Sequence, residues 1–313
     1  MVTVGTWNLE NLFRPGGGSG SPSGDSEYEG KLDALAEVIG RLEPDVLAIQ
    51  EVGDPEALDD LVTRLDGRWH TELAEPDGRG IRVGMLSQLS LTKVEQVRDF
   101  PDYLKPVQVD DDGSTINELG RPALRARVRT GGTSIDVISA HLKSKLLTYP
   151  DGRFNPKNED ERARYAVYAL HRRAAEAAGV RSYANTLLDG AGQERPVIAA
   201  GDLNDEVQAA TTQILLGPPG SEIGTAGYER PDEGDGARLW NLAPHIPRKE
   251  RYSRIYRGRR ELIDHLLVSH ALLDTIKDVT TGEVDTPSIT DRPNERRDEP
   301  SSDHRPVVAT LNV

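Results

Sequence analysis

Carboxylate and amide side chains follow short apolar runs at several separate points of the sequence. Glu51 ends the run DVLAIQEV, Asp202 and Asn204 end PVIAAGDLN, and Asn8 follows the alternating run MVTVGTW. In layered α/β folds the ends of strands are where functional side chains gather, because a rigid scaffold fixes their positions. Turns use the same residue types, so each residue alone has a plain structural explanation. Their recurrence after apolar runs indicates a shared site.

Two histidines and two further aspartates extend this set. His141 ends the run DVISAHL, and Asp303 and His304 are neighbours in SSDHRPVV. Asp264 lies in the otherwise apolar run ELIDHLLVS, where a buried and unpaired carboxylate is costly. We expect His304 to be its partner, provided that the last strand lies beside this one. His265 points to the opposite face of its strand and cannot take that place.

The chemistry of this set is that of oxygen ligands with a few imidazoles. Such ligands suit Mg²⁺ or Mn²⁺ rather than zinc, and the sequence has no cysteine that could supply a thiolate. A divalent metal polarises a phosphoryl oxygen, an Asp–His pair can deprotonate water, and amide or imidazole donors can stabilise the growing negative charge. The residues alone therefore predict a metal-assisted phosphoester hydrolase.

The elements that must position these residues alternate between helix and strand. Residues 31–42 and 159–188 have helical periodicity, and each is followed by a short apolar strand, at 45–52 and 195–205. The order of helix, proline, apolar strand and polar terminus thus appears twice, which suggests two α/β halves. Further strands are predicted at 1–13, 81–89, 123–130, 261–269 and 306–313.

Composition limits the classes of protein to which the chain can belong. We treat residues 1–313 as one domain, with a flexible Gly/Ser/Pro loop at 14–29 and a charged loop at 281–302. The formal net charge of −14 opposes binding to nucleic acid unless basic residues cluster or a divalent cation reverses the local field. We see neither a membrane span nor a signal peptide, and we expect a cytoplasmic protein. The oligomeric state stays open.

Six short motifs occur in a fixed order along nearly the whole chain: WNLEN, QEV, AHLKS, GDLND, LIDHLLVS and SDHRPV. Together they resemble the endonuclease/exonuclease/phosphatase superfamily, which includes DNase I-like nucleases and exonuclease III-like repair enzymes. The resemblance implies a four-layer α/β sandwich, in which two mixed β-sheets pack face to face and helices cover the outside. The chain lacks the Cys-Asp-Arg of the inositol-polyphosphate phosphatases, and it is most similar to generic bacterial members whose substrates are mixed.

The resemblance also implies a role for each motif residue. Asn8, Glu51 and Asp303 match metal-side residues, with Glu51 as the principal ligand. Asp202 and Asn204 match the pair that orients the water and the scissile phosphate, and His141 matches a donor to that phosphate. Asp264 matches the carboxylate that orients His304. Whether His304 or Asp202 accepts the proton from water is left open.

The substrate is predicted from basic residues near these motifs. The stretch 246–261 carries seven basic residues with two tyrosines among them, directly before Asp264. Such a stretch can follow a phosphate backbone and stack bases, or it can be a solvated loop. Candidate substrate contacts are Lys143, Lys145, Arg254 and Arg257. We expect a nuclease first, a phosphatase or phosphodiesterase of a small organic phosphate second, and a catalytically inactive binding module third.

Overall fold

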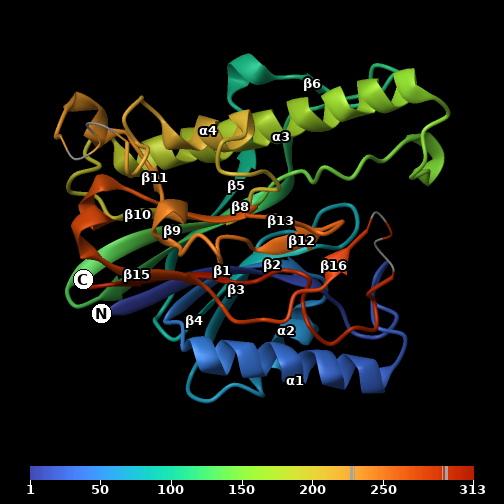
Figure 1. The fold of residues 1–313 in the computed structure, drawn as a ribbon, viewed down its shortest axis with the longest axis horizontal. Helices are drawn as coiled ribbons and strands as arrows, with labels where there is room; N and C mark the ends of the chain where they lie inside the picture. Colours follow the sequence, from blue (N-terminus) through green and yellow to red (C-terminus); the bar gives the residue numbers. More distant parts are fainter. Residues whose placement is uncertain (226–227, 229, 291, 293–294) are drawn as a thin grey trace.

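Two six-stranded mixed sheets pack face to face between two layers of helices (Figure 1). This computed structural model describes residues 1–225, 228, 230–290, 292 and 295–313. Helices α1 (Asp25–Leu42) and α2 (Pro55–Val62) lie on one outer side, and α3 (Glu159–Leu188) and α4 (Ala210–Leu216) lie on the other. The predicted four-layer α/β sandwich is confirmed.

Each large sheet combines strands from distant parts of the chain. The first sheet contains, in spatial order, β15 (Ile276–Thr281), β17 (Val307–Leu311), β1 (Val2–Leu12), β2 (Val46–Val52), β4 (Arg82–Ser87) and β3 (His70–Leu73). The second contains β11 (Trp240–Asn241), β14 (Asp264–Val268), β10 (Val197–Asp202), β9 (Thr133–His141), β8 (Glu118–Thr130) and β5 (Thr92–Asp99). Strands β1 and β2 pair in parallel, as do β9 and β10, and the other neighbours in these two sheets are antiparallel.

Successive side chains of the central strands pack alternately on the two faces of each sheet. In β2, Val46 and Ala48 pack into the core between the two sheets, whereas Leu47 and Ile49 face α1. Because successive side chains of a strand point to opposite faces, a strand buried on both sides reads as one apolar run. The second sheet follows the same rule, with Ile198 facing the inner core and the helix α3 covering its other face. The apolar runs therefore correspond to central strands.

The two long helices begin at acidic first turns. The Asn158 side chain caps α3 by accepting a hydrogen bond from the Glu161 amide at 2.8 Å. We predicted a flexible loop over 14–29, but α1 already begins at Asp25, so residues 25–29 are helical. Acidic side chains in the first turn favour this early start through the helix dipole, and Tyr28 is buried with its hydroxyl bonded to Asp60.

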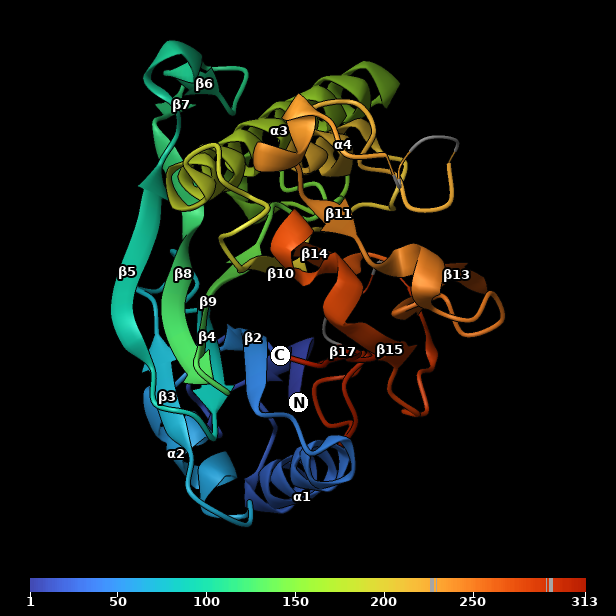
Figure 2. The same cartoon turned by 90° about the vertical axis from the view of Figure 1, so that its left-hand side faces the viewer.

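Short strands add two small sheets to the sandwich. One contains β13 (Arg259–Glu261), β12 (Arg254–Tyr256) and β16 (Ser288–Ile289), and the other contains β6 (Val107–Gln108) and β7 (Thr115–Ile116), which project beyond β5 and β8 (Figure 2). The predicted charged loop 281–302 thus contains a strand, because β16 pairs with β12. Residues 291, 293 and 294 of that range lie outside the described residues. Among the described helices, none has the length and apolar character needed to span a bilayer.

Candidate active site

Strands from both large sheets end at one rim, where irregular backbone directs polar side chains into a cavity. The pairing of β1 with β2 changes register after Asn8, and that of β2 with β4 changes after Gln50. Such bulges re-aim side chains at functional sites. The cavity, here called the rim cavity, has a volume of about 270 Å³, and its lining includes His141, Asp202 and His304.

Four of the residues that line the rim cavity adopt left-handed backbone although none is glycine. Their φ angles are 52° at Glu10, 52° at Asn11, 61° at Glu51 and 53° at Asn204. This conformation is uncommon for side-chain-bearing residues, costs on the order of 1–3 kcal/mol each, and is concentrated at functional sites. The surrounding structure therefore holds these side chains at a definite place on the rim.

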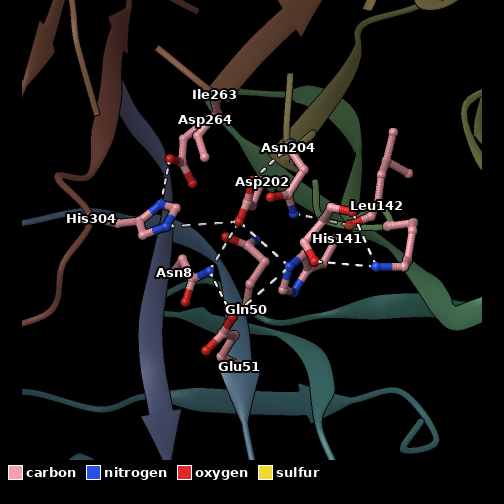
Figure 3. A network of polar contacts seen from close by, with 12 residues as sticks. Asn8, Gln50, Glu51, His141, Leu142, Asp202, Asn204, Ile263, Asp264 and His304 are labelled. Atoms are coloured by element: carbon pink, nitrogen blue, oxygen red, sulfur yellow. Dashed lines mark hydrogen bonds and ion pairs between the residues drawn. The ribbon is translucent and has the colours of Figure 1, made fainter. Parts of the chain in front are cut away.

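Asp202 lies at the centre of the polar network (Figure 3). Its Oδ2 accepts a hydrogen bond from Asn8 Nδ2 at 3.0 Å and lies 3.5 Å from His141 Nε2 and 4.0 Å from His304 Nε2. Its Oδ1 accepts a hydrogen bond from the Asn204 amide at 2.9 Å. Residues from four of the sequence motifs therefore converge on one carboxylate.

Asp264 and His304 form a buried pair on one side of Asp202. His304 Nδ1 donates to Asp264 Oδ2 at 2.7 Å, and both side chains are almost fully buried. We predicted this pairing on the condition that the last strand lies beside the strand of Asp264. That condition is not met, because β17 belongs to the first sheet and β14 to the second. The pair forms across the sandwich, since His304 precedes β17 at the rim that both sheets share.

Of the predicted metal-side residues, Asn8 and Glu51 lie on the other side of Asp202 (Figure 3), whereas Asp303 lies beside His304. Glu51 Oε1 accepts from Asn8 Nδ2 at 3.2 Å, and Glu51 Oε2 accepts from the Asn11 amide at 3.0 Å. Asp303 Oδ1 lies 3.9 Å from His304 Nε2. Glu10, which sequence reasoning missed, accepts a hydrogen bond from the Asp303 amide at 2.8 Å. Its place two residues after Asn8 on the same strand was the signal that could have found it.

His141 reaches the cavity from the end of β9. Its Nε2 faces the carboxylates of Asp202 and Glu51, and its buried Nδ1 has no hydrogen-bond partner among the described residues. The guanidinium of Arg121 holds this strand end by donating to the carbonyl oxygens of His141 and Leu142. Burial, together with the positive charge of Arg121, lowers the pKa of His141 well below 6.5, so the imidazole is neutral at pH 7.

The same burial raises the pKa of acidic groups around the cavity. Desolvation and the nearby Asp264 carboxylate raise the pKa of Asp202 to about 7. Desolvation and Asp303 raise the pKa of Glu10 to about 7. For His304, desolvation opposes the charged form, but the carboxylates of Asp264 and Asp303 outweigh it and raise the pKa to about 10. Carboxylates crowded in this way raise one another's pKa values and that of His304.

The donor set fits a hard divalent cation. Carboxylate and amide oxygens dominate, and the buried Asp264 Oδ1 has no hydrogen-bond partner among the described residues. One compact group, Asp202, Asp264 and His304, offers ligand atoms within 4.8 Å of one another. A cation held by that group would compete for the Asp264–His304 hydrogen bond. Glu51 and Asp303 also line the rim cavity.

The four predicted substrate contacts have different surroundings. Lys143 Nζ donates to the Leu146 carbonyl at 2.7 Å, and burial lowers its pKa to about 7. Lys145 lines the rim cavity but pairs with Asp205 at 2.9 Å. Arg254 lines it too, and is held by Glu261 at 2.8 Å. Arg257 is exposed and is not part of the cavity lining.

The basic stretch 246–261 stacks its own aromatic residues. The Tyr252 ring is buried, with the guanidinium carbons of Arg260 and Arg305 at 4.5 Å and 4.2 Å from its centroid. Tyr256 lines the rim cavity, and Arg254 lies 5.6 Å from its ring centroid. Tyr252 is therefore unavailable for stacking a base, and of this stretch Arg254, Tyr256 and Glu261 face the cavity.

Solved structures with the same architecture include proteins of several activities. The human Nocturnin catalytic domain with bound sulfate is 14% identical, covers 99% of this chain and 94% of its own, and has a TM-score of 0.58. A mannosyl-6-phosphatase from Bacteroides thetaiotaomicron VPI-5482 is 14% identical over 100% of both chains, with a TM-score of 0.57. An AP endonuclease from Archaeoglobus fulgidus is 16% identical over 100% of both chains, with a TM-score of 0.53. At such identities the likeness concerns the fold alone.

The sequence itself also matches a family model. No curated protein matches the chain. The model of the endonuclease/exonuclease/phosphatase family matches residues 5–304, a range that contains Asn8, Asp202 and His304. This chain therefore belongs to the endonuclease/exonuclease/phosphatase family.

Proposed function

We propose that the chain is a Mg²⁺- or Mn²⁺-dependent nuclease that hydrolyses phosphodiester bonds. Members of its family are phosphoester hydrolases. The observation that carries the proposal is the buried Asp264–His304 hydrogen bond of 2.7 Å, with His304 Nε2 directed at Asp202 Oδ2 across 4.0 Å. His304 and Asp202 both line the rim cavity, so one water molecule in the cavity can hydrogen-bond to both.

The protein's part in the reaction begins with that water. Asp264 fixes the tautomer of His304, so that Nε2 faces the rim cavity. His304 in its neutral form, or ionised Asp202, takes a proton as the water oxygen forms a bond to phosphorus. The bond from phosphorus to the leaving oxygen then breaks, and the leaving alkoxide takes a proton from solvent water. The neutral form of His304 would require a cation at the neighbouring carboxylates, because in the metal-free protein they raise the pKa of the imidazole to about 10. Asn204 positions Asp202 through its backbone amide and anchors itself to the Leu142 carbonyl at 3.0 Å.

Donors on the opposite wall would bind the phosphoryl oxygens. His141 is neutral and offers one N–H, which can serve an oxyanion. Arg254 Nε is buried without a hydrogen-bond partner among the described residues, while Glu261 holds the far end of its guanidinium. Glu261 therefore fixes the guanidinium of a residue that lines the rim cavity, as a phosphate ligand requires.

A divalent cation, when bound, would polarise a phosphoryl oxygen and neutralise the leaving alkoxide. Glu51, Asn8 and Asp303 would hold it, and Glu10 supports Asp303 through the backbone amide. The alternative holders are Asp202, Asp264 and His304. The first set leaves the proton-accepting pair free, which is why we favour it.

A phosphatase or phosphodiesterase acting on a small organic phosphate is the second candidate. The rim cavity is small, about 270 Å³, and most basic residues of 246–261 do not face it. Both a mannosyl-6-phosphatase and an AP endonuclease share this fold, so the fold does not select between the two. An inactive binding module is the third candidate, and it is disfavoured because the polar residues of all six motifs are present.

Purified protein assayed with Mg²⁺ or Mn²⁺ against a panel of phosphoesters separates these candidates. The panel contains plasmid, single-stranded DNA, RNA, abasic duplex, bis(p-nitrophenyl) phosphate and sugar monophosphates. We expect diester cleavage to be lost in His304→Ala and Asp202→Ala. The matched control is His270→Ala, which removes a histidine 3.7 Å from Asp235, outside the rim cavity. Turnover of monoesters alone would favour the second candidate, and equal turnover by all variants would exclude the proposed site.

A further inference from the structure

A second cavity, about 530 Å³ in volume, adjoins the rim cavity. We call it the side cavity. The two share lining residues, among them Asn11, Arg79 and Ser144, so a ligand can extend from one into the other. The walls of the side cavity come from the segment after β9, from the start of β8 and from the first half of α3.

The carboxylate of Glu176 joins these three walls. It accepts hydrogen bonds from the Gly120 amide at 3.1 Å, from Arg172 Nε at 2.9 Å and from the Lys143 amide at 2.5 Å. Glu176 is almost fully buried. A methyl group on Gly120 would overlap the Arg172 guanidinium, so the glycine makes room for that cation. The side cavity is therefore a built structure rather than a gap between loops.

The side cavity carries positive charge in an acidic protein. Four basic residues line it, and Asp77 is the acidic residue among its described lining. Arg121 is engaged with Asp77 and with two carbonyl oxygens. Among the described residues, Arg172 donates one hydrogen bond, from Nε, and the side chain of Arg79 has only a 3.7 Å contact with Asp77. Arg79 and Arg172 can therefore still bind an anion.

Aromatic side chains form part of the same wall. Tyr165 and Tyr168 pack edge to face, with centroids 5.5 Å apart, and their hydroxyls bond to Asp110 and Asp111. Phe154 lines the cavity with 54% of its surface exposed. A large apolar ring left open in a cavity that cations also line matches the way proteins stack a nucleobase beside its phosphate.

We propose that the side cavity binds one nucleotide unit of the substrate, next to the phosphate that is cleaved in the rim cavity. The nucleobase stacks on Phe154, and the phosphate of that unit contacts Arg79 and Arg172. The inference that the bound nucleotide belongs to the substrate rests on the proposed function. Binding of a nucleotide in the side cavity does not require catalytic turnover. It places the nucleotide beside α3 rather than on the basic stretch 246–261.

Equilibrium binding tests the proposal without any catalysis. The probes are AMP, ribose 5-phosphate and inorganic phosphate, measured by calorimetry on the full chain with Mg²⁺ present. We expect AMP to bind more tightly than ribose 5-phosphate. Phe154→Ala should weaken AMP about tenfold, within the range for loss of one base–aromatic stack, and should change ribose 5-phosphate less than about twofold. Tyr103→Ala, which removes an exposed aromatic residue outside the cavity, is the matched control.

The cations are tested in the same way. Arg172→Gln should weaken both AMP and ribose 5-phosphate, and Gly120→Ala should do so without removing a charge. Arg68→Gln, at an exposed arginine outside both cavities, should have no effect. The proposal is overturned if AMP and ribose 5-phosphate bind equally, if no probe binds, or if Phe154→Ala behaves like Tyr103→Ala. Loss of hydrolysis in the phosphoester panel with AMP binding intact would refute the proposed function alone.

Discussion

The rim cavity and the side cavity are neighbours that differ in their balance of charge. The rim cavity is lined by five carboxylates, Glu10, Glu51, Asp202, Glu261 and Asp303, and by four basic side chains, Arg79, Arg121, Lys145 and Arg254. The side cavity shares Arg79 and Arg121, adds Lys143 and Arg172, and has Asp77 as the acidic residue among its described lining. A cation in the rim cavity would therefore favour the binding of an anionic phosphate there, whereas in the side cavity the basic residues already outnumber the acidic one. The chemistry and the recognition of substrate are thus separated by about one nucleotide in our proposal.

Removal of divalent metal should produce the largest difference between the two cavities. With EDTA, turnover should fall to background, while AMP should still bind at the side cavity. Glu51→Gln should lower turnover at saturating substrate by at least about 100-fold, since even indirect partners of metal ligands cost roughly 10- to 100-fold. Titration of Mn²⁺ followed by thermal unfolding gives an independent measurement. If Mn²⁺ raises the Tm of Glu51→Gln as much as that of the unsubstituted protein, the metal binds instead at Asp202, Asp264 and His304.

Loss of the Asp264 carboxylate should have the next largest effect. Asp264→Asn should lower kcat about 10²- to 10³-fold, within the range for general acid–base catalysis, and leave AMP binding unchanged. In metal-free protein the carboxylate helps to raise the pKa of His304 to about 10, so the imidazole should titrate at a lower pH in the variant. NMR titration of the histidine ring protons measures this. An unaltered His304 titration would contradict the proposed pairing.

A change of pH should alter the stability of the metal-free protein through the rim cavity. The pKa values of Asp202 and Glu10 are raised to about 7 in the folded state, above those of the unfolded chain. The folded protein then binds more protons between about pH 4 and 7, so the free energy of unfolding falls as pH rises through that window. We expect these two groups to lower the free energy of unfolding by on the order of 5 kcal/mol from pH 5 to pH 8, with His304 adding a further fall between about pH 6.5 and pH 10.

Chemical denaturation at each pH, with and without Mn²⁺, checks this prediction. The cation should remove most of the loss, because it binds the ionised carboxylates and stabilises the folded state in proportion to its binding. A stability that rises from pH 5 to pH 8 without metal would show that the carboxylates of the rim cavity are already compensated within the protein.

Substitution of Lys145 should have the smallest effect. The lysine lines the rim cavity but is paired with Asp205 and partly exposed, and such ion pairs contribute about 0.2–1 kcal/mol. Lys145→Met should therefore change kcat/KM less than about fivefold. Arg254→Met should have a larger effect on kcat/KM, because its guanidinium is buried and fixed by Glu261. Steady-state kinetics on a diester measures both, and the reverse order would mean that the phosphate binds on the Lys145 side.

Much of the fold and the position of the site could be predicted from local sequence. Central strands such as β2 and β10 are apolar on both faces, so the polar residues at their ends, Glu51 and Asp202, stand out against the runs that they follow. The helix α3 has the predicted bounds, 159–188. The location of His304 near Asp264 could be expected, but not that the contact crosses from one sheet to the other.

The partners of charged residues could not be predicted. Lys143 and Lys145 were predicted as substrate contacts, but the first donates to carbonyl oxygens of its own loop and the second to Asp205. Glu176 organises the side cavity from the middle of α3, where its sequence context is that of one more charge on a helix. The choice of an ion-pair partner depends on contacts between distant segments, whereas hydrophobic periodicity is set within about ten residues.

The strand β17 and the residues before it join the first strand of the chain to a segment that is synthesised much later. The indole of Trp7 donates to the carbonyl of His304 across 297 residues, and β17 pairs with β1 in the middle of the first sheet. Because a chain emerges from the ribosome N-terminus first, strand β1 cannot pair with β17 until residues 307–311 have been made. Until residues 303–311 have been made, the rim cavity lacks Asp303 and His304, and the first sheet lacks the strand between β15 and β1.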